Sequence, residues 1–176
     1  MSEYTAKPGA QTIGANILGV IEGSGAFRQT GYRILADLGL KELKQDQWYP
    51  MQPFCDFFEA IEKKFGGATL AMIGKSNGSG LPLPPELNTI EKVYSSFDQV
   101  YRMNFRNVPT NEGWKFTKTG PKSATIVCTG PMPDEYLRGI AIGFGGRFEK
   151  NLVVKFDETQ LRRDKGGNSV TLLVNW

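Results

Sequence analysis

The sequence predicts an α+β fold in which helices come first and a mostly antiparallel sheet of about four strands comes last. Apolar residues recur at helical spacing from residue 12 to about residue 109, whereas from Gly113 onwards apolar and polar residues alternate in short runs. One further helical pattern interrupts those runs. The C-terminal part is therefore predicted as strand, strand, helix, strand, strand, and the earlier helices are expected to cover that unit.

The helical spacing predicts N-terminal helices at residues 12–22, 27–38, 54–65, 68–75 and 88–109. Gly66 and Gly67 are expected to end the third of them. Residues 76–85 are rich in glycine and proline and predict a non-helical connector. Either Asn88 or Thr89 is expected to cap the helix that follows, because both side chains accept hydrogen bonds from a first helical turn.

Strands are predicted at residues 114–118, 122–128, 152–156 and 169–176, with the inserted helix at residues 134–148. The alternation in the first strand is typical of a sheet with one face packed on helices and the other face free. That second face, or the seam between the sheet and the helix of residues 88–109, is where a ligand or a partner is expected.

The length of 176 residues fits one domain, predicted to span residues 12–176, with residues 1–11 as a loose N-terminus. Cys55 and Cys128 are expected to be buried free thiols, with a disulfide as the alternative. No apolar run approaches the roughly 20 residues that span a bilayer. The first residues lack the layout of a signal peptide. A cytoplasmic protein without a membrane segment is therefore expected.

The composition excludes several classes of chemistry. The chain has no histidine, which removes Ser-His-Asp and Cys-His catalysis, histidine-ligated haem and nearly all zinc enzymes. No pair of carboxylates is spaced for acid–base work, so no catalytic residue, metal ligand or cofactor is predicted. The net charge of +3 is spread without a basic block, so nucleic acid is not an expected partner.

Three glycine-containing motifs are interpreted as structural. Gly74-Lys75-Ser76 lacks the earlier glycine of a phosphate-binding loop, because Thr69 stands there. Gly23-Ser24-Gly25 lacks the third glycine of a dinucleotide fingerprint. Gly139 and Gly143 are expected to let their helix approach the sheet or another helix closely. The charges of residues 155–165 have both signs and predict a solvated linker.

The aromatic side chains of the helical part have two interpretations, a packed core or an apolar pocket whose polar tips orient a hydrophobic molecule. In the pocket interpretation, Tyr94, Tyr101 and Trp114 contact the ligand. Arg138 is then the anion-binding group of the pocket, and otherwise an ordinary surface arginine.

Two segments carry a family resemblance, Arg138-Gly139-Ile140 at the inserted helix and Gly166–Trp176 at the end of the chain. With the order of elements, they resemble the superfamily of 4-vinyl-reductase-like domains, haem-nitric-oxide-binding (H-NOX) domains and TRAPP transport-particle subunits. The resemblance covers roughly residues 12–176. It implies a ligand-binding or protein-docking module, which is often dimeric.

This chain departs from the family at the metal and haem positions. Val170 stands where such domains often carry cysteine, and Gly130–Asp134 also lacks one. H-NOX domains hold haem through a histidine and contact it through a Tyr-x-Ser-x-Arg motif, whereas here Arg138 follows Tyr136 at a spacing of two. Haem sensing of that type is therefore not expected.

Three functions are compatible with these observations. The first is a non-enzymatic, cytosolic regulatory or sensor domain that binds a hydrophobic small molecule between helices and sheet. The second is a module that forms a homodimer or docks a protein partner. The third, implied by the resemblance alone, is a tetrapyrrole-related reductase or chaperone.

Overall fold

The structure is a computed structural model that describes residues 4–176. Its helices are α1 (Gly14–Glu22), α2 (Arg28–Asp37), α3 (Met51–Phe65), α4 (Gly67–Gly80), α5 (Ile90–Asn104) and α6 (Asp134–Gly145). Its strands are β1 (Gln11–Ile13), β2 (Trp48–Pro50), β3 (Phe105–Arg106), β4 (Gly113–Gly120), β5 (Ser123–Thr129), β6 (Val153–Phe156) and β7 (Val170–Asn175).

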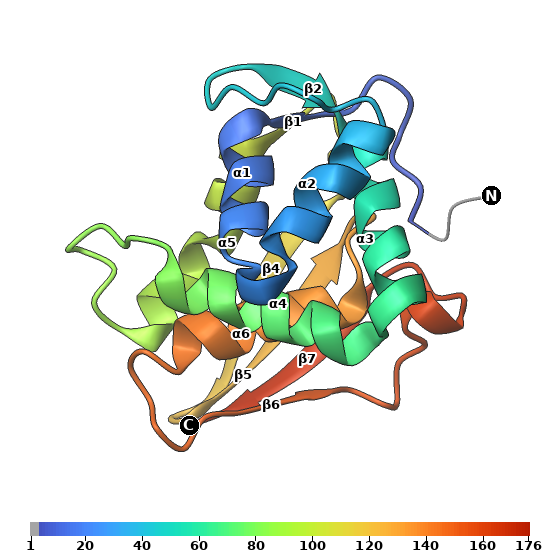
Figure 1. Ribbon diagram of the computed structural model, residues 1–176. Helices are drawn as coiled ribbons and strands as arrows, with labels where there is room; N and C mark the ends of the chain where they lie inside the picture. Colours follow the sequence, from blue (N-terminus) through green and yellow to red (C-terminus); the bar gives the residue numbers. More distant parts are fainter. Residues whose placement is uncertain (1–3) are drawn as a thin grey trace.

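The C-terminal unit has the predicted element order of β4, β5, α6, β6, β7. Its four strands form one sheet in the order β4-β5-β7-β6, and every neighbouring pair is antiparallel. The predicted α+β class, with helices first and one helix inserted into the strands, is therefore confirmed. In Figure 1 the helices lie on one side of this sheet.

The pairing of the strands separates two faces of the four-stranded sheet. Phe116, Ile126, Leu172 and Phe156 lie side by side in one row, and Ile126 and Leu172 are fully buried. The next row lies on the opposite face and consists, in order across the sheet, of Thr117, Thr125, Leu173 and Lys155. Because side chains of a strand alternate between faces, the helices cover only the first row.

Two N-terminal helices match their predicted patterns closely. The stripe of α3 is buried at Phe54, Phe57, Phe58 and Ile61. The helix α5 begins after Thr89, whose side chain accepts a hydrogen bond from the Lys92 backbone N–H. Gly66 follows the last residue of α3 at φ +83°, a left-handed conformation that glycine adopts without strain.

A second sheet was not predicted from the sequence. Strands β2, β1 and β3 pair in that order, and the helix expected at residues 12–22 begins only at Gly14 because Gln11–Ile13 form β1. Each of these strands has two or three residues. Strands this short have no visible alternation, so their pairing depends on partners far away in the sequence.

The helix α4 is longer than predicted. It continues to Gly80, although residues 76–80 were expected to begin a non-helical connector. Gly74 and Gly78 lie against the backbone of α6, where any side chain would overlap it. Close packing of two helices thus stabilises a glycine-rich segment whose intrinsic helix propensity is low.

The N-terminal segment is packed, although a loose terminus was expected for residues 1–11. Tyr4, Ala6 and Ala10 are buried, and the Ala6 backbone N–H donates to Gln52 Oε1 at 2.8 Å. The Gln52 amide in turn donates to the Tyr4 carbonyl at 3.0 Å. These contacts hold residues 4–10 against the start of α3, while residues 1–3 lie outside the described part.

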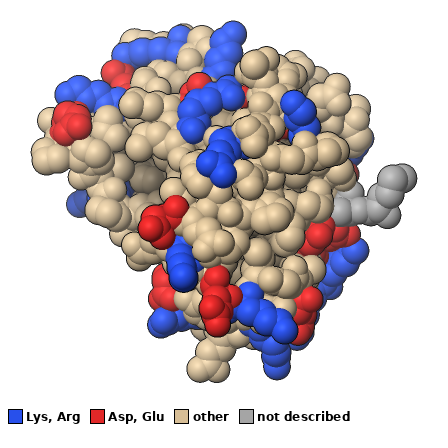
Figure 2. Space-filling model, turned by 90° about the horizontal axis from the view of Figure 1, so that it is seen from above, with Lys and Arg blue, Asp and Glu red and all other residues tan. Residues whose placement is uncertain are grey.

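Figure 2 shows the charges on one face of the molecule. Basic and acidic side chains are scattered there among large uncharged areas, so this face carries no continuous basic surface among the described residues. None of the described helices is long and apolar enough to cross a membrane.

Candidate functional site

The seam between α5 and β4 is built from aromatic rings. Tyr94 and Phe97 of α5 lie edge to face, with ring centroids 5.3 Å apart. Phe97 contacts Trp114 of β4 at 4.9 Å, and Tyr94 approaches Phe116 at 6.2 Å. The aromatic spacing of α5 therefore forms part of a packed core, as one of the two interpretations predicted.

Tyr94 is buried together with its hydroxyl group. Its ring is 1% exposed, and its hydroxyl donates to the carbonyl oxygen of Ala141 in α6 at 2.8 Å. Gly145 lies directly against this hydroxyl, where a Cβ atom would overlap it. Burial raises the pKa of Tyr94 well above its usual range, so the phenol remains neutral and acts as a hydrogen-bond donor.

Tyr101 lies further along α5, near the loop that leads into β4. Its hydroxyl donates to Glu112 Oε2 at 2.8 Å, and its ring lies 4.6 Å from that of Phe105. Burial, followed by the nearby Glu112 carboxylate, raises the pKa of Tyr101 strongly. The hydroxyl is thus already bound within the protein.

Trp114 is half-buried at the start of β4. Its backbone N–H donates to Asp98 Oδ1 at 3.0 Å, which joins this strand to α5. Tyr94, Tyr101 and Trp114 lie on the two elements that border the α5–β4 seam, and their assignment to one ligand site stays a prediction.

Arg138 has other partners. Its Nε and Nη2 atoms donate to Glu135 Oε2 at 3.0 and 2.7 Å, and its guanidinium lies 5.4 Å from the Phe156 ring centroid. Both side chains of the ion pair are 29% exposed. The contacts of Arg138 thus place it beside Glu135 and Phe156, and none joins it to the three seam residues.

A buried ion pair was missed by the sequence reasoning. Asp134 is 3% exposed and accepts a hydrogen bond from Arg163 Nε at 2.8 Å. The side chain of Arg163 is 12% exposed, and its Nη1 atom has no hydrogen-bond partner among the described residues. The expectation of a solvated linker at residues 155–165 is thus wrong for Arg163, because that segment folds back over the start of α6.

The two cysteines are free and buried, as predicted. Burial raises the pKa of the Cys128 thiol to about 12, and the nearby Arg163 charge opposes part of this rise. Burial likewise raises the pKa of Cys55. Thiols that remain protonated are poor nucleophiles and poor metal ligands.

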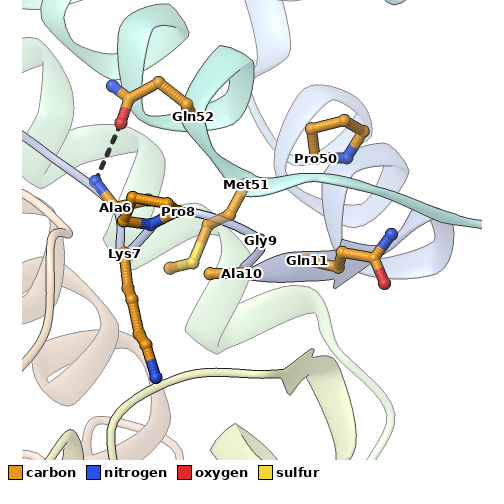
Figure 3. A pocket seen from close by; sticks show the side chains of 9 residues that line it. All are labelled: Ala6, Lys7, Pro8, Gly9, Ala10, Gln11, Pro50, Met51 and Gln52. Carbon is orange, nitrogen blue, oxygen red and sulfur yellow. Dashed lines mark hydrogen bonds between the residues drawn. The ribbon is translucent and has the colours of Figure 1, made fainter.

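Two pockets on the described surface are lined by other residues. One, of about 470 Å³, lies between the N-terminal segment and the start of α3, from Ala6–Gln11 to Pro50–Gln52 (Figure 3). The other, of about 480 Å³, lies where α4 and α6 end, beside Lys75, Arg147 and Lys150. Arg147 donates to the carbonyl oxygen of Leu81, the residue that follows α4, and Glu149 adds a carboxylate to the same lining.

Comparison with solved structures identifies the fold. An H-NOX protein from S. oneidensis in the Fe(II)NO ligation state superposes with a TM-score of 0.69 at 11% identity, covering 93% of this chain and 98% of that one. The Fe(II) unliganded H-NOX protein from K. algicida gives a TM-score of 0.64 at 9% identity, covering 93% and 95%. The chain has the H-NOX fold. No family model and no curated protein matches its sequence.

The H-NOX part of the predicted resemblance is therefore confirmed at the level of fold. The likeness to 4-vinyl-reductase domains and TRAPP subunits stays a prediction. Both H-NOX neighbours are iron proteins by their names, so the question is whether the residues of this chain suit haem.

The donor set of this chain does not fit haem bound through a histidine. The sequence has no histidine, and the buried tyrosine and cysteine groups have raised pKa values. The hydroxyls of Tyr94 and Tyr101 are bound within the protein, and Asn77 Nδ2 lies 3.3 Å from the Tyr136 hydroxyl. Among the described residues, no cluster of three or more Cys, Asp or Glu is arranged to hold a metal ion.

Proposed function

We propose that this chain is a non-enzymatic regulatory domain that has the H-NOX fold, works without haem and acts by contact with another protein. The observation that carries the proposal is the closed α5–β4–α6 seam, in which Tyr94 donates to Ala141 and Tyr101 donates to Glu112. Tyrosine hydroxyls that already donate hydrogen bonds within the protein are not free to orient a ligand.

The buried chemistry also supports a regulatory role over catalysis. A general base or a nucleophile works best with a pKa near the working pH, and burial moves the pKa of the cysteines and of Tyr94 away from it. The free, buried thiols suit the reducing cytoplasm, where we place the protein. A homodimer is one form that the protein contact would take.

A titration with hemin tests the proposal. The purified chain is mixed with one equivalent of hemin, and with protoporphyrin IX in a parallel series, and absorbance spectra and melting temperatures are recorded. We expect the spectrum of free hemin and an unchanged melting temperature. A sharp Soret band at stoichiometric loading, with a raised melting temperature, would overturn the haem-independent part. Selective stabilisation by protoporphyrin would instead favour the tetrapyrrole-related function.

A hydrophobic small molecule remains a second candidate, because Tyr94, Tyr101 and Trp114 share one seam in a fold that holds a ligand in its neighbours. Binding there requires the Tyr101–Glu112 hydrogen bond to open. Native mass spectrometry of protein purified from its source tests this candidate. An adduct that is lost in Trp114→Ala, but kept in the distant variant Trp48→Ala, supports it, and an apo mass alone contradicts it.

A further inference from the structure

No helix or strand of residues 4–176 covers the face of the four-stranded sheet that is turned away from the helices (Figure 1). We call it the outer sheet face and define it by Lys115, Thr125, Val127, Val153, Lys155 and Leu173. Val153 is 42% exposed and Leu173 37%. Large apolar side chains at this exposure, side by side on the neighbouring strands β6 and β7, are found on contact surfaces.

The charges on the outer sheet face are cationic and uncompensated. Lys115 lies on the edge strand β4 and Lys155 on the opposite edge strand β6. Neither ammonium group forms an ion pair within the described part of the chain. Lys118, which points to the other face, is paired with Glu91 at 2.6 Å. The unpaired cations are thus specific to this side of the sheet.

An acidic residue, Asp157, follows the strand that carries Lys155, and its side chain already accepts hydrogen bonds. Asp157 follows β6 and its backbone N–H bonds to the carbonyl of Thr171. Its Oδ1 atom accepts hydrogen bonds from the backbone and the hydroxyl of Thr159, at 3.0 and 2.6 Å. Asp157 is therefore hydrogen-bonded within its own turn, and its carboxylate forms no ion pair with Lys115 or Lys155.

The outer sheet face has apolar side chains near its centre and lysines at its edges. Leu173 and Val127 lie on the central strands beside Thr125 and Thr171, and the lysines lie on the edge strands. Four strands span about 14 Å, and six residues of a strand about 20 Å. A single amphipathic helix, about 10 Å wide, covers such an area with three to four turns. Protein interfaces share this division into an apolar core and a polar rim.

We propose that the outer sheet face docks an acidic amphipathic helix of a partner protein. The apolar stripe of the helix packs on Leu173, Val127 and Val153, and carboxylates on both flanks pair with Lys115 and Lys155. A second copy of this chain fits less well, because two-fold packing of identical faces would bring lysines opposite lysines. The inference rests on the proposed function and names the chemistry of the partner.

Two synthetic helical peptides of about 14 residues provide the test. Both carry the same leucine stripe, and the flanking residues are glutamate in one and lysine in the other. Each is titrated into the isotopically labelled full chain and followed by NMR. We expect only the glutamate peptide to bind, with shifts confined to strands β4–β7, and with an affinity that falls as salt rises.

Two double variants with the same change in charge test whether the peptide binds at the outer sheet face. Lys115→Glu with Lys155→Glu should weaken binding by roughly tenfold or more, because two ion pairs become repulsive. Lys41→Glu with Lys44→Glu, in the exposed loop before β2 and away from the four-stranded sheet (Figure 1), should leave binding within about twofold, because salt screens charges that are far from the bound peptide. The same spectra show that both variants are folded.

The inference would be overturned by shifts outside the four-stranded sheet, by equal binding of both peptides, or by equal weakening by both variants. Broadening of the outer-face signals with protein concentration alone would assign the face to a second copy, and would also overturn it. If the peptide test fails and hemin does not bind, the proposed function stands without this partner, whereas haem binding in the hemin titration would overturn the haem-independent part of the proposed function whatever the peptides do.

Discussion

At the scale of single residues, Tyr94 and Gly145 depend on each other. The Tyr94 hydroxyl reaches the Ala141 carbonyl only because Gly145 leaves room for it in the next turn of α6. Leu152 lies against the same position. Tyr94 thereby joins α5 to α6 from within the core, and this residue couples the two helices that border the seam.

We expect Gly145→Ala to lower the free energy of unfolding by about 2–4 kcal/mol, because its methyl group overlaps a buried hydroxyl and Leu152. Tyr94→Phe alone should cost about 1 kcal/mol through the lost hydrogen bond. The double variant should be more stable than the sum predicts, since the phenyl ring frees space. Urea unfolding measures all three.

The matched control for Gly145→Ala is Gly19→Ala, in the interior of α1, where the nearest atom to an added Cβ is Leu81 Cδ2 at 4.0 Å. Alanine is the better helix former, so this variant should gain about 0.5–1 kcal/mol. Strict additivity of the Tyr94 and Gly145 variants would contradict the proposed dependence.

The buried thiols predict a loss of stability in alkali. The pKa of Cys128 is about 12 in the folded chain, against an ordinary value of 9.0. Unfolded chains therefore lose this proton first, so the stabilisation is complete below pH 9.0 and is lost as the pH rises towards about 12. Above pH 9.0, we expect the free energy of unfolding of Cys128→Ala to fall less steeply than that of the original chain, by about 1.4 kcal/mol per pH unit.

Urea unfolding at several pH values between about 8 and 10.5 measures this difference, a range that brackets the ordinary thiol pKa. Val127→Ala, the neighbouring residue on the opposite face of β5, is the control, since it alters stability without altering its pH dependence. A pH dependence that is equal in Cys128→Ala and the original chain would show that the thiol ionises freely in the folded state.

At the scale of elements, α4 and α6 form a close pair through four glycines, Gly74 and Gly78 of α4 and Gly139 and Gly143 of α6. A Cβ at any of them would overlap a backbone carbonyl of the facing helix. The prediction that Gly139 and Gly143 permit close approach is confirmed, and the partner is α4. Small residues let helix backbones come closer than usual side chains allow.

We expect Gly139→Ala to destabilise the fold by about 3 kcal/mol or more, although alanine has the higher helix propensity, because the backbone of α4 cannot move away without opening the core. Gly80→Ala, at the end of α4 with nothing within 4 Å of the added Cβ, should change stability by less than about 0.5 kcal/mol. Thermal and urea unfolding measure both changes in stability, and similar effects of the two variants would argue against close packing of α4 on α6.

At the scale of the whole molecule, one hydrophobic core joins the two sheets and the helices. It includes Ala10 beside β1, Tyr49 of β2, Phe105 of β3, Tyr94 of α5 and Val174 of β7. A continuous core is expected to melt as one unit. If residues 12–176 form a single domain, as predicted, we therefore expect them to unfold in one cooperative transition.

Two tryptophans allow this to be measured. Trp48 belongs to the three-stranded sheet and Trp114 to the four-stranded one. In a Trp176→Phe background, which removes the third tryptophan, we expect Trp48→Phe and Trp114→Phe each to unfold with coincident fluorescence and far-ultraviolet circular dichroism curves. Separate midpoints for the two regions would show that the sheets unfold independently.

Features that depend on interactions between residues close in the sequence could be predicted, and features that depend on distant residues could not. The stripe of α3 and the alternation in β4 were visible because each pattern lies within one element, where periodicity reports the buried face directly. Thr89 was one of two predicted caps for the same reason, since a cap acts over three residues. The three-stranded sheet, the end of α4 and the burial of Arg163 were missed because each depends on a distant partner.

The sequence by itself determined the α+β class, the order of strands around α6 and the absence of histidine chemistry, because these follow from local periodicity and composition. Only the tertiary structure decided that the hydroxyls of Tyr94 and Tyr101 donate hydrogen bonds within the protein and that Arg138 pairs with Glu135. It also decided that the lysines of the outer sheet face form no ion pair with the described residues. The physical reason is that hydrogen bonds and ion pairs between elements depend on distance in space, which the linear pattern does not contain.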